Sequence, residues 1–231
     1  LNIHAVAPDG KKFDVKGVSF SGNIIHIKAV SSNNEFYGVK AIAPDGSMND
    51  VKGLKMSKDR VEAVVNNVEV YAHIKAIAQS GCAGNNFIWH IKAIHPTGRV
   101  IDVKALDKEG NIYDVKALQD SDQSSLLDVK AFIGDSNQSP VKILLNNDKY
   151  APVKAIAEDG TIYDIKAMET DGSKLDIKGI RRSGNLVHIK AINSKGEYYG
   201  VKAISPSGHL NDVKGVKMLK QDLETTRNGV E

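Results

Sequence analysis

The sequence predicts an all-β protein, an antiparallel meander of about eighteen short strands built from 12-residue β-hairpin repeats. Three observations predict it. A phrase of the form Tyr-Asp-Val-Lys-Ala-Leu recurs along nearly the whole chain, a turn carrying Gly separates successive phrases, and one long segment is present twice. We expect this meander to roll into a spiral, shell or barrel-like form. The alternative is a β-propeller, although no 48-residue period is visible.

The phrase is clearest over residues 101–118, where it occurs twice. Its residues alternate with the period of two that is typical of a strand. Tyr113 and Val115 share one face with Ala117, whereas Asp114 and Lys116 lie on the other. We therefore expect an apolar face that packs in the core and a charged face of Lys and Asp.

Residues 108–110, Lys-Glu-Gly, predict a three-residue hairpin loop, because Gly is the residue best suited to its left-handed third position. This loop would place Lys104 opposite Asp114 and Asp102 opposite Lys116. The same register pairs further residues on the apolar face, namely Ala105 with Tyr113 and Val103 with Val115. The charged face would then be a checkerboard that chiefly specifies register, since each exposed pair contributes only about 0.2–1 kcal/mol.

The Lys of each phrase marks the expected strands in order. These markers are Lys16, Lys28, Lys40, Lys52, Lys75, Lys92, Lys104, Lys116, Lys130, Lys142, Lys154, Lys166, Lys178, Lys190, Lys202 and Lys214. Most lie 12 residues apart, which is one strand and one turn. His4 and Glu62 hold the same position in two further strands.

A long internal duplication relates residues 1–69 to residues 163–231 without a gap, and more than half of the positions are identical. The second copy contains Asn-Gly at 228–229, the strongest two-residue hairpin signal, so we expect the matching Asn66-Asn67 to join strands near 61–65 and 68–77. We treat residues 1–231 as a single β-repeat domain. The second copy stops just after a turn, which suggests a fragment of a longer repeat protein.

Net charge, hydropathy and the numbers and spacing of Cys, His and Asp exclude several classes of function. The net charge of +3 is small and interleaved, so no nucleic-acid-binding surface is indicated, and no run of about 18 apolar residues predicts a membrane-spanning segment. A single Cys excludes an internal disulfide framework. The His and Asp residues match no metal-binding pattern such as HExxH or DxDxDG, so we expect neither a metal nor a cofactor.

Four residues are candidates for ligand binding. Lys28 and Lys190 would face Gly38 and Gly200, so their ammonium groups lack the usual Asp partner; the alternative is an inherited bulge. Trp89 and His90 follow the Gly-rich loop 79–86, where an aromatic ring could stack on a sugar; packing in the core is the alternative. His90 occupies the Asp position of its phrase, as do His26, His73 and His188, and the hairpin register would place His26 opposite Lys16 and His188 opposite Lys178.

The Tyr-Asp dipeptides at 113–114 and 163–164 resemble, in architecture, the tyrosine–aspartate hairpin repeats of bacterial surface proteins and toxins. The chain repeats similar residues and does not bring together the dissimilar ones that catalysis needs. We therefore expect no enzyme activity, and a noncatalytic scaffold or interaction surface of a secreted or cell-surface protein. The alternative is a module that binds acidic polysaccharide and is attached to an enzyme or uptake system; a hydrolase with hidden acids is a third, weaker hypothesis. The partner would be a polysaccharide or another protein.

Overall fold

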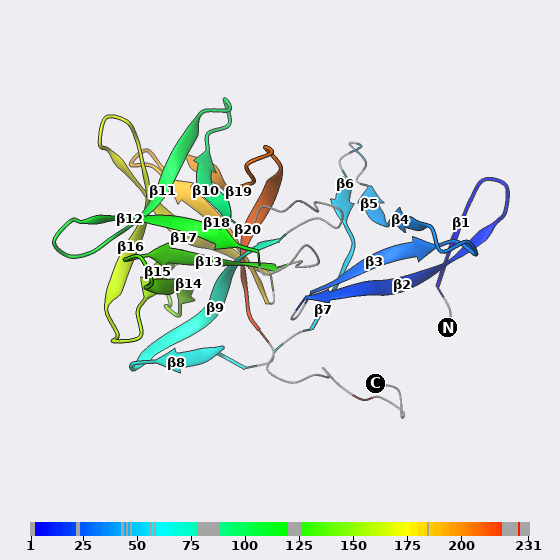
Figure 1. Ribbon diagram of the computed structural model, residues 1–231, viewed down its shortest axis with the longest axis horizontal. Coiled ribbons are helices and arrows are strands. Elements are labelled where there is room, and N and C mark those ends of the chain that lie inside the picture. Colours follow the sequence, from blue (N-terminus) through cyan, green and yellow to red (C-terminus); the bar gives the residue numbers. More distant parts are fainter. Residues whose placement is uncertain are drawn as a thin grey trace. The chain divides into compact units, whose positions relative to one another are not determined.

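The computed structural model describes residues 3–21, 24–42, 44, 46, 48–55, 57, 59–77, 88–119, 126–183, 185–218 and 226. These residues form twenty strands, β1 to β20, with antiparallel pairing throughout, which confirms the all-β meander (Figure 1). None of the described residues forms a helix long and apolar enough to cross a membrane.

The chain divides into two compact units, Leu1–Lys55 (unit 1) and Met56–Glu231 (unit 2), where the sequence led us to expect one domain. The strands of unit 1 are β1 (His4–Val6), β2 (Lys12–Ser21), β3 (Ile24–Val30), β4 (Phe36–Gly38), β5 (Lys40–Ile42), β6 (Met48–Asp50) and β7 (Lys52–Leu54). Strands β1 to β4 pair in sequence, β7 returns to pair with β3, and β5 pairs with β6.

Unit 2 contains one sheet of thirteen strands. Its strands are β8 (Ala63–Val65), β9 (Val68–Ile77), β10 (Ile88–Ile94), β11 (Val100–Leu106), β12 (Ile112–Leu118), β13 (Leu126–Phe132), β14 (Gln138–Leu144), β15 (Ala151–Ile156), β16 (Ile162–Met168), β17 (Lys174–Ser183), β18 (Leu186–Ile192), β19 (Tyr198–Ile204) and β20 (Leu210–Val216). Strand β8 pairs only with the start of β9, and the other twelve pair more widely.

Those twelve strands exchange partners at their midpoints. On one edge, the second half of β10 pairs with the first half of β11, the second half of β11 with the first half of β12, and the second half of β12 with the first half of β10. The three strands therefore close into a ring. The same cyclic pairing forms three further rings among the described strands: β9/β13/β14, β15–β17 and β18–β20.

On its other edge each of these strands pairs with a strand of a different ring. The pairs are β10–β19, β11–β16, β12–β13, β14–β15, β17–β18 and β20–β9, so every ring is joined once to each of the other three. The result is a closed shell with the connectivity of a tetrahedron, visible as the sheet that curves back on itself over β9 to β20 (Figure 1). It closes without the cumulative stagger of a barrel, and the described strands do not form separate four-stranded propeller blades.

The apolar face of the phrase lines the interior of this shell, as the period of two predicts. The core contains the Val or Ile before each marker Lys and the Ala after it, and all the Ala residues at this position in β9 to β20 are inaccessible to solvent. Tyr113 lies opposite Ala105, as predicted. Its side chain packs edge-on against that of Tyr163, which belongs to the β15–β17 ring of strands, with 5.6 Å between the centroids of the two aromatic groups. Small residues opposite large ones keep the core evenly filled.

The predicted turns are confirmed. The backbone N–H of Gly110 donates to Asp107 O (3.3 Å) and that of Asp107 to Asn111 O, which encloses residues 108–110 as a three-residue loop, and Gly110 has φ +90°. Asn66 and Asn67 join β8 to β9 with φ of +47° and +63°, the values of a two-residue hairpin turn.

The predicted register holds for only half of each hairpin. Lys104 lies opposite Asp114, but Asp102 lies opposite Lys92 and not Lys116. Val103 likewise lies opposite Ala167 of β16 and not Val115. The simple hairpin register is wrong there because β11 and β12 separate after three residue pairs, each to complete the ring with β10.

Candidate functional site

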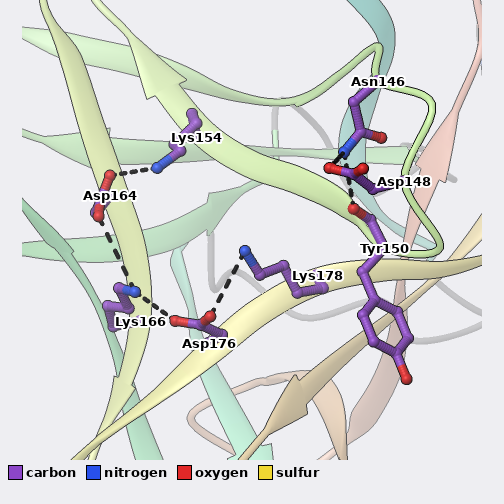
Figure 2. A network of polar contacts seen from close by, with 8 residues as sticks. All are labelled: Asn146, Asp148, Tyr150, Lys154, Asp164, Lys166, Asp176 and Lys178. Atoms are coloured by element: carbon purple, nitrogen blue, oxygen red, sulfur yellow. Dashed lines mark hydrogen bonds and ion pairs between the residues drawn. The ribbon is translucent and has the colours of Figure 1, made fainter.

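The outer face of each ring carries the marker lysines and the Asp residues that precede them. Figure 2 shows the β15–β17 ring, where Lys154 binds Asp164, Lys166 binds Asp176, and Lys178 Nζ lies 3.5 Å from Asp176 Oδ2. Lys166 also lies 4.0 Å from Asp164, so the five side chains form one continuous row. The β10–β12 ring repeats the row through Lys92, Asp102, Lys104, Asp114 and Lys116.

Ionisation of these Asp residues is favoured by the lysines around them. Hydrogen bonds from Lys104 and Lys116 hold the pKa of Asp114 below its ordinary value of 3.8. Burial opposes ionisation of Asp176, but the hydrogen bond and charge of Lys166 outweigh it, and its pKa is also lowered. The carboxylates of Asp114 and Asp176 are therefore ionised at neutral pH.

The marker lysines also face one another at the six places where a strand of one ring pairs with a strand of another. We call these places joints; the sequence analysis did not predict the Lys–Lys pairs there. Each of the six joints contains one Lys–Lys cross-strand pair. The pairs are Lys92–Lys202, Lys104–Lys166, Lys116–Lys130, Lys142–Lys154, Lys178–Lys190 and Lys214–Lys75. Like charges directly opposite each other are unfavourable. Most of these ammonium groups bind a carboxylate within their own ring, which offsets the repulsion.

Lys190 differs from the other markers, as predicted, because it lies opposite Gly200. No carboxylate oxygen in the described part of the chain lies within 4.0 Å of its Nζ. Its other neighbour is Lys178, and its pKa is lowered by burial and then by the charges of Lys214 and Lys202. In unit 1, Lys28 lies opposite Gly38 in the same way.

Trp89 is 2% exposed, so its ring does not present a face on which a sugar could stack. Its Nε1 donates a hydrogen bond of 2.9 Å to Gln119 Oε1 in the buried interior. The stacking interpretation of Trp89 is therefore replaced by the packing interpretation. His90, the next residue, is exposed and lies opposite Lys116 and Ile204. The structure does not bring His90 together with Lys190 in any described contact. The Gly-rich loop 79–86 lies outside the described residues.

The register predicted for two histidines is wrong. His26 lies opposite Ser19 and Lys52, and His188 lies opposite Lys214, because a bulge in each preceding strand shifts the pairing. In both histidines Nδ1 accepts a hydrogen bond from the Nζ of the Lys on the paired strand, at 2.6 Å from Lys52 to His26 and at 3.1 Å from Lys214 to His188. Among the described residues no group of three or more His, Cys, Asp or Glu could hold a metal ion.

A groove of about 480 Å³ lies where three hairpin turns of unit 2 meet. Arg99 forms a two-pronged ion pair with Glu169, with both N–O distances 2.7 Å, and the His95 ring packs edge-on against Tyr199. The other lining residues are Asp171, Ser173, Lys174, Leu175, Asn193, Ser194, Lys195 and Glu197. The sequence did not predict this groove, because the three turns are brought together by pairing between strands that are far apart in the chain, β10 with β19, β11 with β16 and β17 with β18.

Comparison with known proteins gives a family match. A protein-family model described as a family of unknown function (DUF7486) matches residues 1–77 and 85–231, almost the whole chain. No curated protein and no solved structure matches the chain.

Proposed function

The chain belongs to this family of unknown function, and we propose that it is a noncatalytic repeat module that serves as a structural scaffold or interaction surface. A secreted or cell-surface location fits such a module.

The observation that supports this proposal is that the charged side chains of a ring form ion pairs with one another. In the β10–β12 and β15–β17 rings, five charged side chains bind one another in the same order and at the same register positions. A reactive centre needs groups of different kinds with unequal environments. Repetition of one pairing over a closed surface instead supports a role in shape and assembly.

The proposal is tested by chromatography of the intact chain on immobilised acidic and neutral polysaccharides, from low to high salt. If the chain is a scaffold whose Lys and Asp side chains neutralise one another, it should be retained on neither matrix more strongly than on an uncharged control resin. Specific retention that survives high salt on one neutral glycan would contradict it.

Acidic polysaccharide binding is the second candidate function, and Lys190 is the observation that favours it. Its ammonium group faces Gly200, and the charges of two other lysines, Lys214 and Lys202, lower its pKa together with burial, while Asp212 is the one acid that acts in the opposite direction. An anionic group approaching over the Gly would meet several positive charges and no side chain of residue 200.

Lys190→Ala combined with Lys28→Ala tests this candidate, with Lys166→Ala as the matched control. Lys166 has the same place in its strand but binds two carboxylates. Binding at the Gly positions predicts salt-sensitive retention on acidic matrices that the double variant loses and Lys166→Ala keeps. Equal weakening by both variants would show that only the overall charge matters, and would overturn the site.

A further inference from the structure

Unit 1 has the same internal pairing as part of the shell in unit 2. Strand β3 closes a ring with β4, β5, β6 and β7 through Lys28–Gly38, Lys40–Asp50 and His26–Lys52. The β18–β20 ring uses the equivalent pairs, Lys190–Gly200, Lys202–Asp212 and His188–Lys214. Strand β2 pairs with β3 as β17 pairs with β18, with a bulge at the same place.

The outer edges of this ring differ between the two units. In unit 2, β19 pairs with β10 through Val201 and Ala93, and β20 pairs with β9 through Val213 and Ala76. In unit 1, the equivalent strands β5 and β7 pair only with β6 and β3, respectively, within the described sheets. No described strand therefore pairs along the other edges of β5 and β7, where β10 and β9 complete the shell in unit 2.

The inward face of unit 1 is exposed accordingly. Tyr37 is 47% exposed, whereas Tyr199, its equivalent, is 3% exposed in the core of unit 2. Ala41 is exposed, whereas Ala203 is inaccessible to solvent. Exposed apolar side chains next to strand edges along which no described strand pairs are the features of a surface that takes up further strands.

The space over two glycines of unit 2 indicates where the side chains of such a partner would fit. A Cβ at Gly215 would lie 2.1 Å from Ile143 Cδ1, and one at Gly179 would lie 3.4 Å from Ala151 Cβ. Ile143 and Ala151 belong to β14 and β15, so these glycines receive side chains from the first part of unit 2. Unit 1 has Gly53 and Gly17 at the same positions, where a Cβ would meet only side chains of Ile25 and Ile27.

We propose that unit 1 is a docking surface for a second copy of the segment 56–162, whose strands β9 to β15 and the first part of β16 would complete it as a closed shell. The pairing and shape of unit 1 support this docking role independently of the proposed scaffold role. The second copy would supply Ala93 opposite Val39, Ala76 opposite Val51, and Ile143 against Gly53. Leu1 aligns with Tyr163, so a copy of 56–162 linked before Leu1 would have the same order of strands as unit 2.

The test is a chain in which residues 56–162 are fused directly before Leu1 of the intact 231-residue protein. Hydrogen–deuterium exchange is measured by mass spectrometry on two peptides of distinct sequence, 36–42 and 198–204. In the original chain, 36–42 should exchange much faster than 198–204. In the fused chain, its exchange should slow by at least about tenfold, toward that of 198–204.

A control fusion carries Ala93→Asp in the added segment only. Ala93 lies inside the shell, so an Asp there would be buried without a partner and should leave 36–42 as unprotected as in the original chain. Three results would overturn the proposal: 36–42 already protected in the original chain, no slowing in the fused chain, or equal slowing in the control fusion.

Discussion

Replacement of Gly215 by Ala tests how tightly the shell is packed where β20 meets β14. The new Cβ would lie 2.1 Å from Ile143 Cδ1, 3.3 Å from Ile143 Cγ1 and 3.1 Å from Val187 Cβ. The first distance is shorter than any normal contact and the other two are tighter than most, and both neighbours are completely buried. Either Ile143 changes rotamer or the strands move apart.

The expected cost follows from these contacts. Overpacking of a tight core costs about 1–3 kcal/mol, and Ala in place of Gly returns about 0.4–1 kcal/mol by reducing the freedom of the unfolded chain. We therefore expect Gly215→Ala to lower the free energy of unfolding by about 1–2 kcal/mol. Ile143→Val removes the Cδ1 atom at a cost of about 0.5–1.5 kcal/mol. In the double variant the loss of unfolding free energy should be about 1 kcal/mol smaller than the sum of the two single losses, because Ile143→Val removes the atom that makes the shortest contact.

Denaturation in urea, followed by fluorescence of Trp89, measures these changes. Trp89 is the only tryptophan and is buried in unit 2, so its signal reports the unfolding of that unit. Gly134→Ala in the same unit is the matched control, because no described atom lies within 4 Å of its new Cβ. A Gly215→Ala protein as stable as the original, with strictly additive effects in the double variant, would refute this account of the packing.

Three other substitutions have specific expected results. Asn67→Val should lower the free energy of unfolding by about 1–3 kcal/mol because a β-branched residue is strained at φ +63°, while Asn67→Gly should cause no loss; urea denaturation checks both. Gln119→Leu leaves the buried N–H of Trp89 without that acceptor, and should cost about 1–3 kcal/mol and change the emission maximum. The pKa of Asp114 is lowered in the folded state by hydrogen bonds from Lys104 and Lys116, so its stabilising effect is complete above the ordinary pKa of 3.8 and is lost as the pH falls through the lower folded-state value. Unit 2 should therefore lose stability on acidification below about pH 4, and Asp114→Asn should weaken that dependence; an unchanged acid profile would contradict the reasoning.

The local structure could be predicted from the sequence, because each of these features depends on residues that are close together in the chain. The period of two assigned Tyr113 and Val115 to the interior, and the Gly at the third loop position, such as Gly110, fixed the three-residue turns. Alignment with Asn228-Gly229 identified the turn at Asn66-Asn67. These predictions depend only on residues within one hairpin.

The rest depends on strands far apart in the sequence. A two-strand register gives no reason for Asp102 to leave Lys116 and pair with Lys92, because that exchange is required only when a third strand closes the ring. The joints between rings bring Lys104 opposite Lys166, 62 residues later (166 minus 104), which no local pattern encodes. Trp89 was misleading for the same reason: its neighbour in sequence is a polar loop, but its partner in space is Gln119.

Disulfide cross-linking is the most direct test of ring closure by partner exchange. In a Cys82→Ser background, Lys104→Cys with Lys166→Cys places two thiols at directly opposed positions of β11 and β16, within the reach of a disulfide. Asp102→Cys with Lys116→Cys is the pair that a continuous hairpin would join. The structure predicts rapid oxidation of the first pair and not of the second, read by peptide mapping under non-reducing conditions. Cross-linking of Asp102→Cys with Lys116→Cys, and none between positions 104 and 166, would contradict the closed shell.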